Sequence, residues 1–319
     1  MLALTPAVVP ALASALLPGL LAGSLAAPPA ATPDPRGQDD TLAVGWLHLR
    51  PCDVLPGAWC GHLDRPWRAG APGSVRVGFA YLPASSGESA GTLVPHEGGP
   101  GYSTTGSGEW FAQMYGDLLA DHDLLLVDQR GTGRTAAIAC PELDDGSMSY
   151  VRAVGRCARS LGDRAWDYGT AASADDLAGV LDALGIDRVD MYGDSYGTFF
   201  AQVFAGRHPT RLRTLVLDGA YPTYGESAWY PTQAPALRLS LRAVCARSVM
   251  CADGEPGDPV AELRALLDRL RTRPVDVRAP GADGRLHRVT LDPAAVAAVA
   301  YNATYLPATY REFTGAVRA

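Results

Sequence analysis

Residues 188–198 read Arg188-Val189-Asp190-Met191-Tyr192-Gly193-Asp194-Ser195-Tyr196-Gly197-Thr198. A short apolar strand runs into the pattern Gly-x-Ser-x-Gly, and a helix-forming stretch follows it directly. This context is typical of a nucleophile elbow, which exposes a serine hydroxyl to a base and to the next backbone N–H. We therefore predict that Ser195 is a nucleophile and that the N–H of Tyr196 holds an oxyanion. The flanking Gly193 and Gly197 keep the crowded turn free of side-chain clashes.

A glycine-rich turn follows an earlier apolar strand. The strand Thr92-Leu93-Val94-Pro95 leads into His96-Glu97-Gly98-Gly99-Pro100-Gly101. A turn without side chains lets a backbone N–H approach the reacting carbonyl, so we predict that Gly98 or Gly99 supplies the second oxyanion donor. Two interpretations of Glu97 stay open: a loop carboxylate with no task, or a group that helps to hold a charged substrate amine.

A third motif directly follows another apolar run. Asp123-Leu124-Leu125-Leu126-Val127 has the pattern of a buried strand and leads into Asp128-Gln129-Arg130-Gly131-Thr132-Gly133. We interpret Asp128 and Arg130 as a pair that braces the loops below the site, rather than as residues that touch substrate.

Together, the three motifs resemble those of one family. The segments 98–101, 128–133 and 193–197 are similar, in this order, to the motif set of the proline iminopeptidase and tripeptidyl aminopeptidase group of α/β-hydrolases. The resemblance runs from about Trp46 to the end of the chain. It implies a serine exopeptidase that acts on peptides with a free amino terminus, with a helical cap over the site. No cofactor and no metal are expected.

The order of the expected elements predicts an α/β fold. Strand patterns occupy 74–82, 93–95, 124–128, 188–192 and 212–218, and helical patterns occupy 173–184, 199–207, 260–271 and 293–301. We expect the first of these helices to begin with Ser173-Ala174-Asp175-Asp176 as a capping box and to stop at Gly185. Strands that alternate with helices predict a doubly wound, mostly parallel sheet with helices on both faces. We assign the core to residues 41–220 and the cap to residues 221–319.

The acid and base of a catalytic triad are harder to place. In this fold they follow the serine along the chain, and only His208 and His287 follow Ser195. A helix would carry His208 roughly 15 Å away, and no core strand with an aspartate precedes His287. Asp218 follows a core strand, but the resemblance places the acid after the cap, so we interpret Asp218 as structural. We therefore expect the acid and base beyond Ala319, with the last part of the core.

Three alternatives remain open. Gly-x-Ser-x-Gly can arise by chance in a loop of a chain with 35 glycines, although the flanking strand and helix favour the elbow. The protein could be a hydrolase-like binding protein that has lost its base, although retention of Ser195 and both oxyanion segments favours an enzyme. It could also be a secreted esterase, because the same elbow serves esters as well as amides.

Composition limits the class of protein. The chain has 319 residues, of which 47% are hydrophobic and 19% charged, which suits one large domain and an accessory one. Its net charge of −7 gives no electrostatic support to nucleic-acid binding.

The amino terminus predicts export. Leu12 to Ala27 is an apolar run that is interrupted by Pro18-Gly19 and ends in small residues, as in a secretory signal peptide. The run is too short and too broken for a stable membrane span. No Lys or Arg precedes Arg36, so either the start is misplaced or the run is only an apolar tail. We assign residues 1–27 to a signal peptide and 28–40 to a disordered linker, and expect a secreted or envelope-associated protein.

The cysteines agree with export. The six cysteines fall into three pairs that are close in sequence: Cys52 with Cys60, Cys140 with Cys157, and Cys245 with Cys251. Short C-x-x-C ligand pairs with nearby histidines, as in metal sites, do not occur. We therefore predict three local disulfides formed in an oxidising compartment.

Overall fold

The computed structural model describes residues 40–144, 148–224, 232–248, 257–281, 284–303 and 307–318. The predicted signal peptide and all of the predicted linker except Asp40 lie outside the described residues. In the part that is described, no helix has both the length and the apolar character needed to cross a bilayer. Residues 41–319 form one compact unit.

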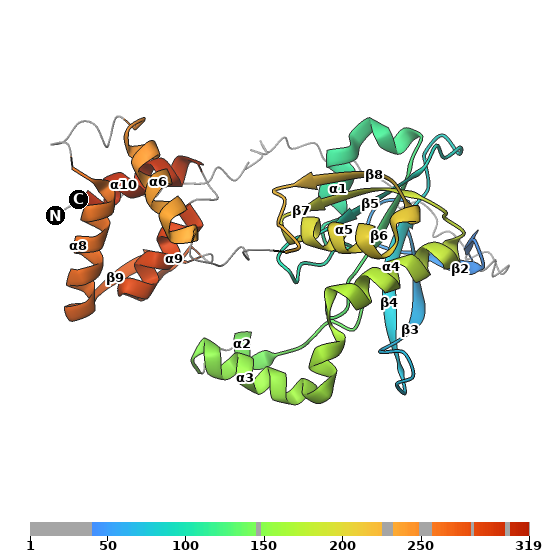
Figure 1. Ribbon diagram of the computed structural model, residues 1–319, viewed down its shortest axis with the longest axis horizontal. Coiled ribbons are helices and arrows are strands. Elements are labelled where there is room, and N and C mark those ends of the chain that lie inside the picture. Colours follow the sequence, from blue (N-terminus) through green and yellow to red (C-terminus); the bar gives the residue numbers. More distant parts are fainter. Residues whose placement is uncertain are drawn as a thin grey trace, which may run out of the picture. The chain divides into compact units, whose positions relative to one another are not determined.

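An eight-stranded mixed sheet carries the predicted motifs (Figure 1). Its strand order is β1-β2-β3-β4-β6-β5-β7-β8. The strands are β1 Leu42–Val44, β2 Leu47–Pro51, β3 Trp59–Pro66, β4 Ser74–Leu82, β5 Thr92–His96, β6 Asp123–Val127, β7 Val189–Asp194 and β8 Leu212–Asp218. The strands β1 to β4 and β6 pair antiparallel, whereas β5 pairs parallel with β6 and β7, and β7 pairs parallel with β8. The predicted α/β fold is confirmed, with an antiparallel first half that the sequence did not reveal.

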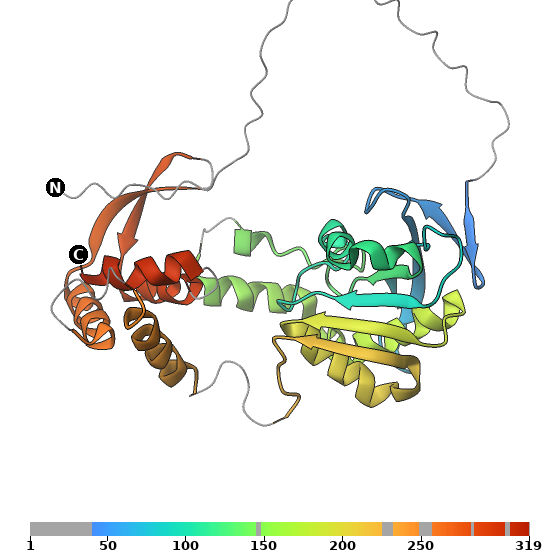
Figure 2. The same cartoon turned by 90° about the horizontal axis from the view of Figure 1, so that it is seen from above.

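Helices cover both faces of this sheet. The helices up to β8 are α1 Gly108–Tyr115, η1 Gly116–Ala120, α2 Pro141–Asp144, α3 Tyr150–Leu161, η2 Gly162–Asp167, α4 Thr170–Leu184, α5 Tyr196–Arg207 and η3 Pro209–Arg211. Of these, α1, α4 and α5 contribute buried residues to the two cores of the sheet. Successive residues of β6 enter opposite cores: Leu125 packs with residues of α4 and α5, whereas Leu124 packs with Phe111 of α1. Figure 2 shows α1 and α5, in teal and yellow, on opposite faces. Because both faces are covered, β5 and β6 are buried along their whole length.

One predicted helix start is wrong. The helix α4 begins at Thr170 with Gly169 as its N-cap, and no side chain caps it, so Ser173 and Asp176 form no capping box. Both side chains are buried inside the helix, where Asp176 binds an arginine. The predicted stop is confirmed, because Gly185 takes the left-handed conformation with φ 70°.

The segment after β8 forms a small helical unit with its own core. It contains α6 Gln233–Cys245, α8 Pro259–Thr272, α9 Pro293–Ala303, α10 Pro307–Arg318 and the hairpin of β9 Val275–Pro280 with β10 Leu286–Leu291. Leu241, Val260, Ala300 and Phe313 are buried together at its centre. The helices predicted at 260–271 and 293–301 are confirmed. Their assignment to a cap, like the domain boundaries, stays a prediction.

Two of the three predicted disulfides are present. Cys52–Cys60 joins the residue after β2 to β3, and Cys140–Cys157 joins the residue before α2 to α3. The third predicted pair, Cys245 with Cys251, lies outside the described residues because Cys251 does.

Candidate active site

Ser195 occupies the sharp turn between β7 and α5. Its backbone angles are φ 51° and ψ −121°, and Ala136 is the other non-glycine residue with a positive φ in the described part of the chain. Such a conformation costs about 1–3 kcal/mol and persists where neighbouring structure holds it. Here the N–H of Ser195 donates to the carbonyl of Asp218 (2.9 Å), and its carbonyl accepts the hydroxyl of Thr198 (2.6 Å). The turn thus has the geometry expected of an elbow.

The two glycines of the motif are steric requirements, as the sequence predicted. A Cβ atom at Gly193 would lie 2.3 Å from the carbonyl oxygen of Gly197. A Cβ atom at Gly197 would lie 2.1 Å from the carbonyl oxygen of His96. The second contact joins the elbow to the end of β5, so the two strand ends of the site pack backbone to backbone.

The glycine-rich turn lies against the elbow. A Cβ atom at Gly98 would lie 2.9 Å from the Cβ atom of Ser195. The N–H of Gly98 donates to Oε2 of Glu97 (2.9 Å). Within the described residues, the N–H groups of Gly99 and Tyr196 have no acceptor. Of the two candidates for the second oxyanion donor, the geometry therefore favours Gly99 over Gly98.

Three carboxylates gather beside the elbow. Burial, followed by the charges of Glu97 and Asp218, raises the pKa of Asp194 to about 6. The hydroxyl of Tyr192 donates to Asp218 (3.1 Å), and burial together with this carboxylate raises the pKa of Tyr192 to about 12. No arginine or histidine of the described residues forms an ion pair with Glu97, Asp194 or Asp218. The electrostatic potential around Ser195 is therefore negative, which favours binding of a cationic group.

His96 is close to this site but is not placed as a base. Its ring is 4% exposed and stacks on Phe200 with 3.6 Å between ring centroids. Its Nδ1 lies 2.9 Å from the carbonyl oxygen of Glu97, so Nδ1 carries the proton. Burial lowers the pKa of His96 to about 4, which keeps the ring neutral at ordinary pH. The ring packs the end of β5 onto α5.

Two histidines, His208 and His287, follow the serine along the chain. His208 directly follows α5, and its Nε2 lies 2.9 Å from Asp175 of α4, which agrees with the structural role that we expected. His287 lies on β10 opposite Ala279. Among the described residues, no histidine is hydrogen-bonded to the hydroxyl of Ser195.

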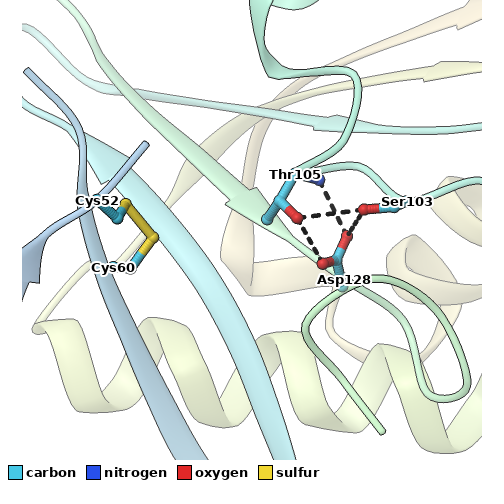
Figure 3. The surroundings of a disulfide bond; sticks show 5 residues. All are labelled: Cys52, Cys60, Ser103, Thr105 and Asp128. Atoms are coloured by element: carbon cyan, nitrogen blue, oxygen red, sulfur yellow. Dashed lines mark hydrogen bonds between the residues drawn. A yellow bond between two sulfur atoms is a disulfide. The ribbon is translucent and has the colours of Figure 1, made fainter. Parts of the chain in front are cut away.

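The expected pairing of Asp128 with Arg130 is wrong. Arg130 is 6% exposed and donates twice to Asp176 (2.6 and 2.9 Å), and its remaining donors bind backbone carbonyls. Asp128 binds residues of the glycine-rich loop instead, as Figure 3 shows for Ser103 and Thr105. Both residues brace loops, but each does so with partners of its own. Nothing in the sequence pointed to Asp176, because it is 46 residues away.

Comparison with known proteins gives the following matches. The α/β-hydrolase fold family matches residues 91–242. Serine protease Hip1 of Mycobacterium tuberculosis (strain ATCC 25618 / H37Rv) is 30% identical over 205 residues, covering 56% of this chain and 39% of Hip1. Tripeptidyl aminopeptidase of Streptomyces lividans is 25% identical over 201 residues, covering 54% of this chain and 37% of that protein. The match thus spans less than two fifths of the length of these relatives.

Solved structures give weaker likenesses. The proline iminopeptidase of Mycobacterium smegmatis is 19% identical, with a TM-score of 0.38, and the match covers 66% of this chain and 54% of that chain. A thermophilic esterase of Thermogutta terrifontis is 21% identical, with a TM-score of 0.35, and the match covers 66% and 59% of the two chains.

Proposed function

We propose that this chain, whose residues 91–242 match the α/β-hydrolase fold family, is part of a secreted serine aminopeptidase that cleaves peptides through an acyl-enzyme on Ser195. The observation that carries this proposal is the elbow itself. A strained serine between β7 and α5 stands beside two backbone N–H groups that have no acceptor in the described chain. This arrangement retains two features that acyl transfer needs, a half-exposed serine in an elbow and backbone donors that can hold an oxyanion.

The proposed chemistry assigns one role to each group. The oxygen of Ser195 attacks the carbonyl carbon of the scissile peptide bond. The N–H groups of Tyr196 and Gly99 hold the negative charge that develops on the carbonyl oxygen. A histidine removes the proton of Ser195 and later gives it to the leaving amine, and an acid orients that histidine. We place the histidine and its acid outside residues 1–319.

The carboxylates beside the elbow support a substrate with a cationic amino terminus. An ammonium group carries one positive charge and three donors, and Glu97 is the carboxylate next to the oxyanion segment. One of the relatives is named a tripeptidyl aminopeptidase, which agrees with an exopeptidase. We propose that Glu97 contributes to binding of the substrate amine.

The test compares substrates that differ only at the amine. The full-length protein should hydrolyse tripeptide p-nitroanilides with a free amino terminus far faster than the same peptides acetylated. Glu97→Gln should raise KM for the free peptide and leave the acetylated one unchanged. Glu88→Gln, a change at an exposed loop residue, is the control. Equal rates on both peptides, with high activity on short acyl esters, would instead identify an esterase.

Export belongs to the same proposal. The apolar run 12–27 predicts that the mature protein begins after Ala26 or Ala27. Amino-terminal sequencing of protein recovered from its host tests this directly. An intact Met1 in a cytoplasmic fraction would refute export.

A further inference from the structure

We propose that Asp128 is the positioning residue of the oxyanion site, because it fixes the loop that carries the Gly99 donor. This inference rests on the proposed function, since it concerns the same site. Asp128 belongs to the sequence motif 128–133, to which no role in the reaction has been given so far.

Asp128 directly follows β6 and is 1% exposed. Its Oδ1 accepts the hydroxyl of Ser103 (3.0 Å) and the N–H of Thr105 (2.9 Å). Its Oδ2 accepts the hydroxyl of Thr105 (2.6 Å) and the N–H of Arg134 (2.7 Å). Figure 3 shows the carboxylate beside Ser103 and Thr105. Each oxygen thus accepts two hydrogen bonds, and three of the four donors belong to the loop that follows the Gly98-Gly99-Pro100-Gly101 turn.

The carboxylate itself is held rigidly. The N–H of Asp128 donates to the carbonyl of Gly78 on β4 (3.2 Å), and the carbonyl of Asp128 accepts the hydroxyl of Thr135 (2.8 Å). The loop is therefore tied to β4 and β6 at the centre of the sheet. A group positioned in this way has only one geometry, which is what a prearranged oxyanion site requires.

The loop needs such an anchor because its own residues cannot supply one. Gly99 and Gly101 have positive φ values of 111° and 131° and no side chains that could pack. The connection from the anchor back to the donor is a hydrogen bond: the N–H of Glu97 donates to the hydroxyl of Thr104 (3.4 Å). Thr104 lies between Ser103 and Thr105, the two residues that Asp128 binds. Hydrogen bonds therefore hold the turn 98–101 on both sides, at Glu97 before it and at Ser103 after it.

The glycine that ends the motif is explained by the same contact. A Cβ atom at Gly133 would lie 2.2 Å from Oδ2 of Asp128 and 2.3 Å from Oγ of Ser103. Any side chain at this position would displace the carboxylate or the loop. The motif therefore contains both the anchor and the space that the anchor needs.

Loss of the anchor should affect the transition state more than the bound substrate. The oxyanion forms only during reaction, so a displaced donor lowers kcat and leaves KM nearly unchanged. Removal of an oxyanion donor elsewhere costs about 10²–10³ in kcat. We expect Asp128→Asn to lower kcat on the order of 10²-fold. One carboxylate oxygen is replaced by an NH2 group, which cannot accept the two hydrogen bonds that this oxygen accepts.

The experiment measures kcat and KM of the full-length protein on a tripeptide p-nitroanilide. Thr105→Val should lower kcat about 10-fold with KM within about 3-fold, and Thr105→Ser, which keeps the hydroxyl, should restore it. Ser107→Ala is the control, because the Ser107 hydroxyl is in the same loop but makes none of these hydrogen bonds. In Asp128→Asn, adding Thr105→Val should cause no further loss. Wild-type kcat in the folded Thr105→Val and Asp128→Asn variants, or a change confined to KM, would overturn the proposal.

Hydrogen exchange separates this proposal from the proposed function. In Asp128→Asn, exchange should accelerate at residues 97–105 and stay unchanged at 189–194. Unchanged exchange at 97–105 would overturn the proposal even in an active enzyme. A wild-type protein that hydrolyses no peptide but shows slow exchange at 97–105, lost in Asp128→Asn, would refute the peptidase and keep the anchor.

Discussion

At the scale of single residues, the elbow combines backbone strain with backbone contact. Ser195 keeps a conformation that most residues avoid, and Gly193 and Gly197 let the surrounding chain approach closely enough to hold it. The strain and the glycines are therefore one feature, because a methyl group at either glycine would push away the backbone that stabilises the serine.

Gly197→Ala tests this. The added methyl would lie 2.1 Å from the carbonyl oxygen of His96, so backbone must move, and we expect a loss of about 1–3 kcal/mol or more in unfolding free energy. Gly206→Ala, on the same helix α5, meets no atom within 4 Å and should stabilise by about 0.5–1 kcal/mol. Urea unfolding measures both. Equal effects of the two changes would contradict the steric argument.

The raised pKa of Asp194 predicts that the free energy of unfolding depends on pH. In the folded protein its pKa is raised to about 6, whereas the ordinary value is 3.8. The folded state then binds more protons between about pH 4 and pH 6, so this residue makes stability fall as pH rises through that window. His96 acts oppositely, since burial lowers its pKa from 6.5 to about 4.

Asp194→Asn isolates the carboxylate, because the variant keeps His96. We expect the variant to melt at a higher temperature than wild type at pH 7.5, and the difference to shrink toward pH 4. Thermal unfolding across this range gives the comparison. A difference that does not change with pH would rule out a strained ionised carboxylate at this position.

The sequence predicts residues well where the cause is local. Ser195 and its glycines could be recognised because the strand, turn and helix that make an elbow are contiguous. The partners of Asp128 and Arg130 could not, because Ser103 is 25 residues from Asp128, and Asp176 is 46 from Arg130. A charged pair that is close in sequence suggested an ion pair, but the fold gives each group a distant partner.

At the scale of elements, the hydrophobic pattern and the burial of each strand or helix decided whether its bounds could be predicted from the sequence. The strands β4 and β8 have the predicted bounds, 74–82 and 212–218. The start of α4 was missed because Ser173 and Asp176 look like capping residues, yet tertiary contacts bury both inside the helix. The antiparallel strands β1 to β3 were missed as well. They are mostly half-buried or exposed, so their pattern differs little from that of a loop.

The disulfides also act on elements. Cys52–Cys60 and Cys140–Cys157 close loops with sequence separations of 8 and 17, which restrict the unfolded chain by about 2–3 kcal/mol each. We expect reduction to lower the melting temperature, and Cys140→Ser with Cys157→Ser to loosen α2 and α3 without unfolding the sheet. Non-reducing peptide mapping should find these two links and Cys245 with Cys251. Crossed links, or free thiols throughout, would refute the local pairing.

At the scale of the whole molecule, the sheet has β8 at one edge of the described strands. Val216 of this strand is 54% exposed, whereas the residues of the neighbouring β7 are alternately buried and half-buried. The aligned regions make up 39% and 37% of the two relatives. That the histidine and the acid for Ser195 lie outside residues 1–319 stays a prediction.

Labelling by a fluorophosphonate probe decides between these possibilities. Loss of a triad histidine elsewhere costs on the order of 10⁶ in turnover, although the oxyanion donors remain. We therefore expect residues 1–319 alone to label weakly, and a longer protein with a further core strand, its Asp and a later His to label at Ser195. Ser195→Ala should abolish that labelling. Strong labelling of residues 1–319 that disappears in His287→Ala would place the base on β10, with the triad complete in this chain.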